Sequence, residues 1–186
     1  MEHGVPRPQS SRVPTWFERK FDFTFPVEHY PMVCVRLWGT PLRLDGMLRD
    51  VRTDAGVLVA RPQQRWSAQE QAGHLLDLEP LWMTRVDDFL TGRDTLAAAD
   101  VGNRKTHEAN HNARELAEIL TGFRTARLRL VELLGACDPD VFARTSLHPR
   151  LKQPMRLVDH LYFVAEHDDH HLARIWELID GHSRKR

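Results

Sequence analysis

The sequence has few cysteines, no net charge and no long apolar run, and each absence narrows the class of protein. Its two cysteines, Cys34 and Cys137, do not form a C-x-x-C pair. The 26 basic and 26 acidic residues cancel, so no overall field attracts DNA, RNA or an anionic membrane. The sequence contains no apolar run of about 18 residues, and its first residues do not predict a signal peptide. We therefore expect a cytoplasmic protein with reduced thiols and with neither a nucleic-acid nor a membrane partner.

Length and composition fit a single folded unit. A chain of 186 residues, 41% of them hydrophobic, can form one compact domain that buries on the order of 70% of its unfolded surface. We predict a flexible arm over residues 1–15, which contain several prolines and arginines. We predict one domain over residues 16–182 and a basic tail over residues 183–186. Phe21, Phe23 and Phe25 alternate, which predicts an extended segment that packs three rings on one surface.

Apolar residues recur every three or four positions in four stretches, which predicts four substantial helices. The first helix is expected to begin at Thr40-Pro41, an N-cap followed by a first-turn proline. Pro31 and Gly39 limit the residues before it to a short helix. The third helix is expected over about residues 113–136 and the fourth over about residues 155–179.

The second helix has the clearest start. Ser67 and Glu70 form a capping box, and Trp66 occupies the hydrophobic-staple position before it. We expect this helix to end near Gly92, and we expect loops at residues 57–65, 94–105 and 146–154. With no convincing strand pattern, the sequence predicts an all-α fold, a four-helix bundle with an extended N-terminal arm.

Two histidines on the last helix have the spacing of metal ligands. His167 and His171 fall one turn apart on the edge of its apolar face, so both imidazoles point inward and can share one metal. The spacing alone is a weak signal in a chain with 11 histidines, so a third ligand is needed. His74 lies on the apolar stripe of the second helix, where a lone histidine is usually a core residue.

A second histidine pair lies in His107-Glu108-Ala109-Asn110-His111. On a helix, H-E-x-x-H supplies two zinc ligands and the general base of a metalloprotease. Thr106, Asn110 and Asn112 are poor helix-interior residues, and no apolar stripe runs through the motif. We interpret it as a polar loop in which Asn112 and Glu115 cap the next helix. A metalloprotease with ligands His107 and His111 is the least favoured function.

Arg127 falls in the middle of the apolar seam of the third helix. A guanidinium buried there without a partner costs several kcal/mol. Asp168 projects inward beside His167 on the last helix, so we predict an Arg127–Asp168 ion pair that supports the metal site. The alternative is that Arg127 extends to the rim of the bundle.

Two motifs of this chain belong together. The first, on the second helix, is Trp66-Ser67-x-x-Glu70-x-x-Gly73-His74-Leu75-x-Asp77-x-Glu79, and the second, on the last helix, is Ala165-Glu166-His167-Asp168-Asp169-His170-His171-Leu172-Ala173-Arg174-Ile175. Together they resemble the motifs of the DinB-like superfamily, including its YfiT-like proteins. The resemblance covers nearly all of residues 39–179. It implies a four-helix bundle that holds a divalent metal, often zinc or nickel, through one histidine of the second helix and an H-x-x-x-H pair of the last. In this chain those ligands are His74, His167 and His171.

Two further histidines compete for this role. We expect His160 to be a core residue or pocket wall, and His170 to be a surface or rim residue. Glu70, Asp77 and Asp168 are the nearest carboxylates for proton transfer, but the sequence identifies no catalytic acid or base.

Three neutral imidazoles leave a metal its full charge and an open position, as catalytic sites require. Such a metal activates water or a bound thiol. Families similar to this one include hydrolases and transferases that use bacillithiol, mycothiol or glutathione. We therefore expect a metal-dependent hydrolase or low-molecular-weight-thiol S-transferase that acts on a small-molecule substrate.

The competing expectation is a non-enzymatic metal- or ligand-binding bundle, either a sensor or a structural protein. A fourth protein ligand such as His160 would favour a structural site. A homodimer is also an expectation, because two-fold dimers are the commonest soluble oligomers.

Overall fold

The computed structural model describes residues 13–51, 53–62 and 65–183. Its long helices are α1 (Tyr30–Leu48), α3 (Ala68–Leu90), α5 (Leu116–Gly135) and α6 (Leu157–Ser183). Its short helices are α2 (Ala55–Leu58) and α4 (Arg104–Glu108), and its strands are β1 (Thr145–His148) and β2 (Gln153–Arg156). Short 3-10 turns cover Trp16–Glu18, Val27–His29, Arg49–Val51, His111–Ala113 and Pro139–Ala143. No helix in the described part of the chain is both long and apolar enough to span a membrane.

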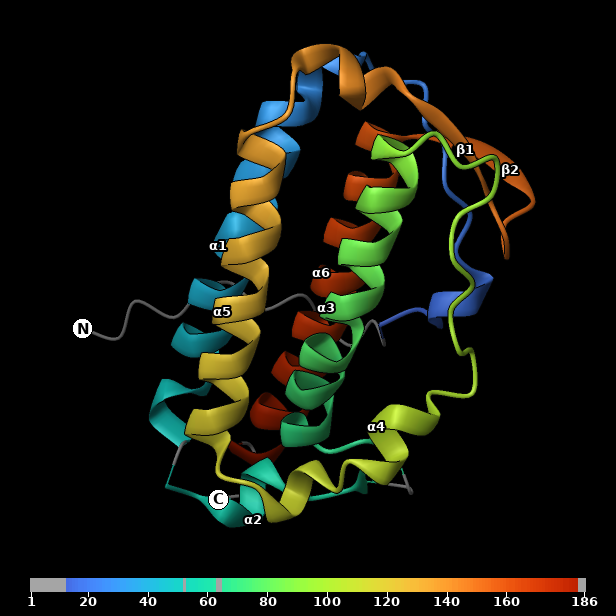
Figure 1. Cartoon of the computed structure of the whole chain (residues 1–186). Helices are drawn as coiled ribbons and strands as arrows, with labels where there is room; N and C mark the ends of the chain where they lie inside the picture. The colour runs from blue at the N-terminus through green and yellow to red at the C-terminus, as the bar shows by residue number, and fades with distance from the viewer. Residues whose placement is uncertain (1–12, 52, 63–64, 184–186) are drawn as a thin grey trace.

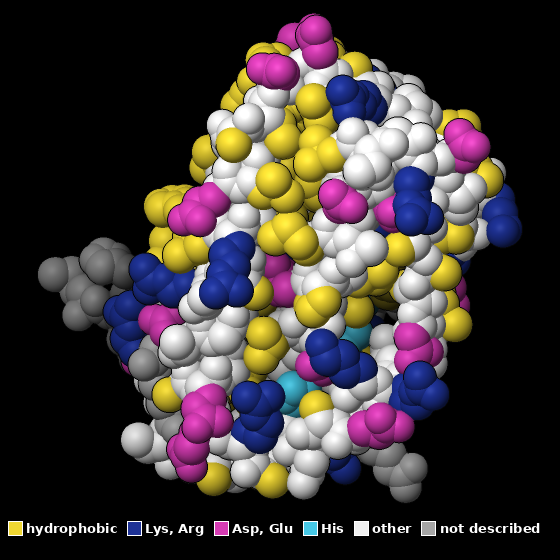
Figure 2. Space-filling model, viewed as in Figure 1, with side chains coloured by type: hydrophobic (Ala, Val, Ile, Leu, Met, Phe, Trp, Pro, Cys, Tyr) yellow, Lys and Arg dark blue, Asp and Glu magenta, His cyan; other side chains and the backbone are white. Residues whose placement is uncertain are grey.

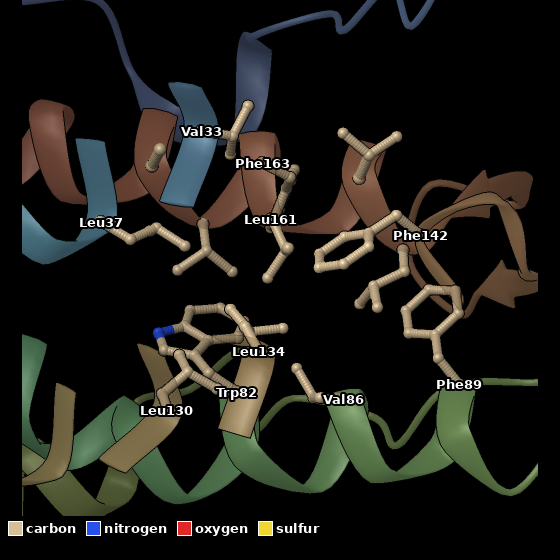
Figure 3. Packing of buried hydrophobic residues seen from close by; sticks show 14 of the residues in the cluster. Val33, Leu37, Trp82, Val86, Phe89, Leu130, Leu134, Phe142, Leu161 and Phe163 are labelled. Atoms are coloured by element: carbon tan, nitrogen blue, oxygen red, sulfur yellow. The ribbon is translucent and has the colours of Figure 1, made fainter. Parts of the chain in front are cut away.

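The four long helices form a bundle, as the sequence predicts. Helices α1 and α3 each pack against both α5 and α6, and the small hairpin lies beside one end of the bundle (Figure 1). The larger core cluster fills one half of the interior, where Trp82 and Phe89 of α3 face Leu37 of α1, Leu161 of α6 and Phe142 (Figure 3). A second apolar cluster, around Leu44, Leu75 and Phe123, fills the other half.

The predicted start of the first helix at Thr40 is wrong. Helix α1 begins at Tyr30 and continues through Gly39 and Pro41 to Leu48. Pro41 has no N–H for the carbonyl of Leu37, four residues earlier. Arg127 Nη1 donates to that carbonyl at 3.4 Å, so a side chain from α5 replaces part of the missing helical bond.

The loop predicted over residues 146–154 is instead a hairpin. β1 and β2 pair antiparallel, with Ser146 opposite Met155. The segment that follows α3 extends the pairing on the other side of β1, where Leu96 N–H donates to the carbonyl of Leu147 at 3.1 Å. The buried positions of β1 are Ser146 and His148, which are polar. Sequence alternation of apolar and polar residues therefore gives no sign of this strand.

The aromatic residues after the arm pack as predicted. The Phe21 ring centroid lies 5.0 Å from that of Phe163, and the Phe25 centroid lies 5.2 Å from that of Tyr162, both on α6. Residues 1–12 of the predicted arm and residues 184–186 of the predicted tail lie outside the described residues.

Candidate metal centre

Helix α3 begins and ends as the sequence predicts. Ser67 Oγ accepts from Glu70 N–H at 3.1 Å, and Ser67 N–H donates back to Glu70 Oε2 at 2.9 Å, which completes the capping box. The helix ends two residues before Gly92, whose φ of +71° suits a residue without Cβ. Trp66 precedes the cap, and its ring lies 4.7 Å from that of His74. The cap thus sets both the start of α3 and the position of an aromatic side chain over His74.

Three histidines meet between α3 and α6. His74, His167 and His171 each present a ring nitrogen within 4.8 Å of the others, and all three residues are buried. Their ring centroids are separated by 4.4 Å between His167 and His171 and by 4.6 Å between His74 and His171. The three residues identified by the resemblance are therefore brought together in one cluster.

Hydrogen bonds orient two of the rings. His171 Nδ1 lies 2.6 Å from Gln71 Oε1, and because an amide oxygen only accepts, Nδ1 carries the proton. His74 Nδ1 lies 3.0 Å from Thr106 Oγ1. Both rings therefore direct Nε2 toward the cluster, where His171 Nε2 and His167 Nε2 are 3.1 Å apart. Gln71 and Thr106 were not selected from the sequence, because neither shows a ligand pattern.

A second layer of contacts holds Thr106 in place. Burial raises the pKa of Asp77, but hydrogen bonds from His111 and Thr106 outweigh this effect and keep the pKa below its ordinary value. His111 Nε2 lies 2.7 Å from Asp77 Oδ2. A Cβ at residue 73 would lie 2.2 Å from the His111 ring, so only Gly73 allows this approach. Asp77 is thus engaged with His111 and Thr106, which leaves it unsuited to proton transfer.

The H-E-x-x-H residues do not form a metal site. His107 is exposed at the end of α4, whereas His111 is fully buried in the following 3-10 turn. Asn110 has a φ of +46°, which ends the helix between them. The predicted loop is therefore partly helical. Asn112 accepts from Ser67 Oγ at 2.6 Å, and no side chain caps the next helix at Glu115, so the predicted caps of α5 are wrong.

Burial keeps the clustered imidazoles neutral. It lowers the pKa of His74 to about 4, with neighbouring histidines adding to the effect and Asp77 opposing it. Burial also lowers the pKa values of His167 and His171 well below the ordinary value. A metal-ligating histidine must be neutral, so these three side chains are in the required protonation state at pH 7.

The carboxylates around His167 anchor α6 to the rest of the bundle. Glu166 accepts from Arg19 and Arg36, and Asp169 accepts from Arg36 and Arg43. These ion pairs tie α6 to α1 and to the segment before α1, so they restrain the rotation that points His167 and His171 inward.

The predicted Arg127–Asp168 ion pair is present and fully buried. Asp168 Oδ2 also accepts from Thr40 Oγ1 at 2.9 Å, and Arg127 Nη2 donates to Glu79 at 2.5 Å. Burial and the negative charge of Asp168 raise the pKa of Glu79 to about 7, although Arg127 opposes this. Arg127 therefore does not reach the rim, and Glu79 is a partner that the sequence analysis did not identify.

The two competing histidines lie outside the cluster. His160 is fully buried, and its ring contacts Trp82 and Phe89 at centroid distances of 5.8 Å, as expected of a core residue. His170 is half-buried beside His171 and lines the cavity described next, as expected of a rim residue.

A cavity of about 500 Å³ opens onto the cluster. On α3 its wall is a stripe formed by His74, Leu78, Trp82 and Arg85. The segment 98–103 forms part of the opposite wall. Figure 2 shows a hollow on this face of the molecule, with a histidine side chain at its edge. The cavity gives small molecules access to the three histidines.

A family model of the DinB superfamily matches residues 40–175. This chain belongs to the DinB superfamily. The solved structure of YfiT from Bacillus subtilis, described as a probable metal-dependent hydrolase with an unusual four-helix bundle topology, matches with a TM-score of 0.76 and 21% sequence identity. The match covers 89% of this chain and 94% of that chain, and at this identity it shows a shared fold. A search of curated proteins gave no match.

The three histidines of this DinB-superfamily chain fit a divalent metal. Their Nε2 atoms converge, two of the Nδ1 atoms are bonded outward, and all three rings are neutral. Outward hydrogen bonds of this kind orient ligating histidines in metal sites. Imidazole donors suit several divalent metals, including zinc, copper, iron and nickel.

Proposed function

We propose that His74, His167 and His171 hold one divalent cation, with zinc or nickel preferred, and that the protein is a metal-dependent hydrolase or thiol S-transferase. The convergence of three neutral imidazoles at a cavity carries this proposal. When bound, the cation would lower the pKa of water or of a low-molecular-weight thiol and so supply a nucleophile near pH 7.

The protein side chains would orient the ligands and limit the entry of water. Thr106 and Gln71 fix two of the imidazoles through their Nδ1 atoms. Trp66 covers His74, and Trp82 lies with its ring centroid 5.6 Å from that of His167. Aromatic walls so close to the histidines lower the local dielectric, which strengthens electrostatic interactions with a bound substrate.

The carboxylates near the cluster already have other partners. Glu70 binds Ser67 and Arg61, Asp77 binds His111, and Asp168 binds Arg127. These three side chains would therefore act in positioning and not as a general acid or base.

A structural metal site is the competing function. Among the described residues, the group of potential ligands within range consists of the three histidines, and His160 is not part of it. Three protein ligands with access from a cavity are typical of catalytic sites, whereas structural zinc usually has four. This difference favours an enzyme over the sensor or structural protein.

Elemental analysis of protein purified without a histidine tag tests the proposal. We expect about one zinc or nickel ion per chain in the wild type and none in the His167→Ala/His171→Ala double variant. His107→Ala is the matched control, because this histidine is exposed and lies outside the cluster; it should retain the metal. A wild type that takes up no metal after reconstitution, or a double variant that keeps it, would contradict the proposal.

A further inference from the structure

A second group of polar side chains lines the same cavity, away from the histidine cluster. It consists of Arg85 on α3, His148 on β1 and Arg150 in the hairpin turn. Arg85 and His148 are each 1% exposed. Among the described residues, no carboxylate forms an ion pair with Arg85 or Arg150. A buried guanidinium without an anion is costly, so this arrangement calls for a ligand.

The hydrogen bonds of His148 show that a donor faces Arg85. His148 Nδ1 accepts from the backbone N–H groups of Arg150 at 3.3 Å and Leu151 at 3.2 Å, so Nδ1 carries no proton. A neutral imidazole then has its proton on Nε2. His148 Nε2 lies 3.2 Å from Arg85 Nη1, which is also a donor. Two N–H groups therefore face each other, and neither finds an acceptor in the other.

Arg150 adds a further unsatisfied donor. Its Nη2 atom is buried and has no hydrogen-bond partner among the described residues. Its guanidinium lies over the rings of Phe17 and Phe163, with distances of 5.3 Å and 5.8 Å to the ring centroids. Stacking between two rings holds the guanidinium in the cavity wall without neutralising it.

The nearby carboxylates are engaged elsewhere. Asp88 accepts from Ala97 N–H at 2.7 Å and pairs with Arg93 at 3.4 Å. Asp100 lines the cavity but accepts from the N–H groups of Gly102 and Arg104, each at 3.0 Å. Arg85 itself donates from Nε to the carbonyl of Ala97 at 2.8 Å. Within the described part of the chain, no oxygen accepts a hydrogen bond from either terminal nitrogen of Arg85, so both can still bind an oxyanion.

We propose that Arg85, His148 and Arg150 bind an oxyanion, a carboxylate or phosphate group, of the small molecule on which the histidine cluster acts. The binding of the oxyanion stands on these three residues alone, and only the position of its reacting group rests on the proposed function. Paired guanidinium groups and an imidazole N–H match the acceptor oxygens of such a group.

The length of the cavity constrains the substrate. His74 and Arg85 are eleven residues apart on α3, which places their Cα atoms about 16 Å apart along the helix. Leu78 and Trp82 lie between them on the same cavity wall. The substrate is therefore an extended acid with an apolar middle section, whose anionic end lies at the hairpin and whose reacting end lies at the histidines.

Isothermal titration calorimetry with benzoate, phenyl phosphate and neutral benzamide tests the oxyanion site. The titrations use the metal-free full-length chain, so that no probe can bind through a metal. We expect benzoate or phenyl phosphate to bind more tightly than benzamide, and the tighter of the two identifies the carboxylate or phosphate preference. Arg85→Gln and Arg150→Gln should each weaken anion binding by about tenfold or more and leave benzamide binding unchanged.

Arg174→Gln is the matched control for these variants. Arg174 lines the same cavity, but it pairs with Glu177 at 3.0 Å, so its loss should change anion affinity by less than about twofold. Circular dichroism verifies the fold of each variant, and Arg150→Gln, at a partly exposed position, serves if Arg85→Gln unfolds. Equal affinities of wild type and both variants for the anions, or no saturable anion binding to the wild type, would overturn the proposal.

The same titrations on the His167→Ala/His171→Ala variant separate the two proposals. Retained anion binding in a variant that has lost metal binding is the expected result. If the wild type binds anions but no metal, the proposed enzyme function fails and the oxyanion site stands. If it binds metal but no anions, the oxyanion site fails and the metal centre stands.

Discussion

Arg127 and Arg85 are both almost completely buried, yet their surroundings are opposite. Arg127 lies between Asp168 and Glu79 in the middle of the bundle, whereas Arg85 lies beside His148 at a cavity wall with no paired carboxylate among the described residues. Burial alone would lower the pKa of Arg127, but the two carboxylates raise it above its ordinary value. Burial lowers the pKa of Arg85 to about 10, and Asp88 only partly opposes this.

The difference separates a structural arginine from a binding arginine. The charge of Arg127 is neutralised within the chain, so its contacts serve the packing of α1, α3, α5 and α6. The charge of Arg85 is left for a ligand, because Arg85 is still protonated near pH 7 and its side chain lines the cavity. The cavity thus joins the histidine cluster, which burial keeps neutral, to a cationic group that suits an anion.

The largest effect is predicted for a substitution that breaks the ion pairs of Arg127. Arg127→Met should lower the free energy of unfolding by about 3–5 kcal/mol, because Asp168 and Glu79 would be left buried without a cation. Arg85→Met removes a charge that has no carboxylate partner, so its effect should be within about 1 kcal/mol. Urea denaturation of both variants measures the difference, and equal losses would refute the distinction between the two arginines.

The same distinction applies to two buried threonines, Thr106 and Thr40. Thr106 hydrogen bonds with His74, so Thr106→Val should weaken metal binding by about 10- to 100-fold. Thr40 hydrogen bonds with Asp168, within the structural ion-pair group, so Thr40→Val should affect stability more than metal affinity. Competition titrations with a zinc chelator measure the affinities. A larger loss of affinity in the Thr40 variant would contradict the assignment.

The buried histidines extend the comparison to groups that burial keeps neutral. The pKa of His74 is about 4 in the folded chain and about 6.5 when unfolded, so the unfolded state binds the extra proton between these values. The contribution of neutral His74 to the stability of the metal-free protein is therefore fully present above about pH 6.5, and it is lost as the pH falls toward 4. His74→Gln should reduce the slope by up to about 1.4 kcal/mol per pH unit. Unfolding curves at several pH values measure it, and an unchanged slope would argue against a buried neutral His74.

The smallest effect on stability is predicted for a partly exposed ion pair. Arg174 and Glu177 pair at 3.0 Å, three residues apart on α6, and both side chains are partly exposed to solvent. Arg174→Gln should change the free energy of unfolding by less than about 1 kcal/mol. Denaturation in low and high salt checks this value. A loss as large as that of Arg127→Met would show that burial is not what separates the arginines.

Much of the bundle could be predicted from the sequence, because helix periodicity and the Ser67 and Glu70 cap are local signals. The gathering of His74, His167 and His171 came from the family resemblance, since helical spacing alone supported only the pair on α6. The ion pair of Arg127 and Asp168 was predictable because an arginine within an apolar stripe requires a partner.

The features that were missed depend on contacts between distant elements. Helix α1 continues through Pro41, helped by the Arg127 bond to the carbonyl of Leu37. Thr106 reaches His74 from a different helix. The oxyanion site depends on a strand whose buried residues are polar, so no alternation of apolar residues marks His148.

X-ray absorption spectroscopy of the zinc-loaded protein tests the central claim most directly, because it reports which atoms bind the metal. We predict three imidazole nitrogens and an oxygen donor, all at about 2.0–2.1 Å, with the oxygen replaced by sulfur at about 2.3 Å when a small thiol is added. His160→Ala should leave the spectrum unchanged, because His160 lies outside the cluster. A fourth protein ligand that persists when thiol is added would contradict an open, reactive metal centre.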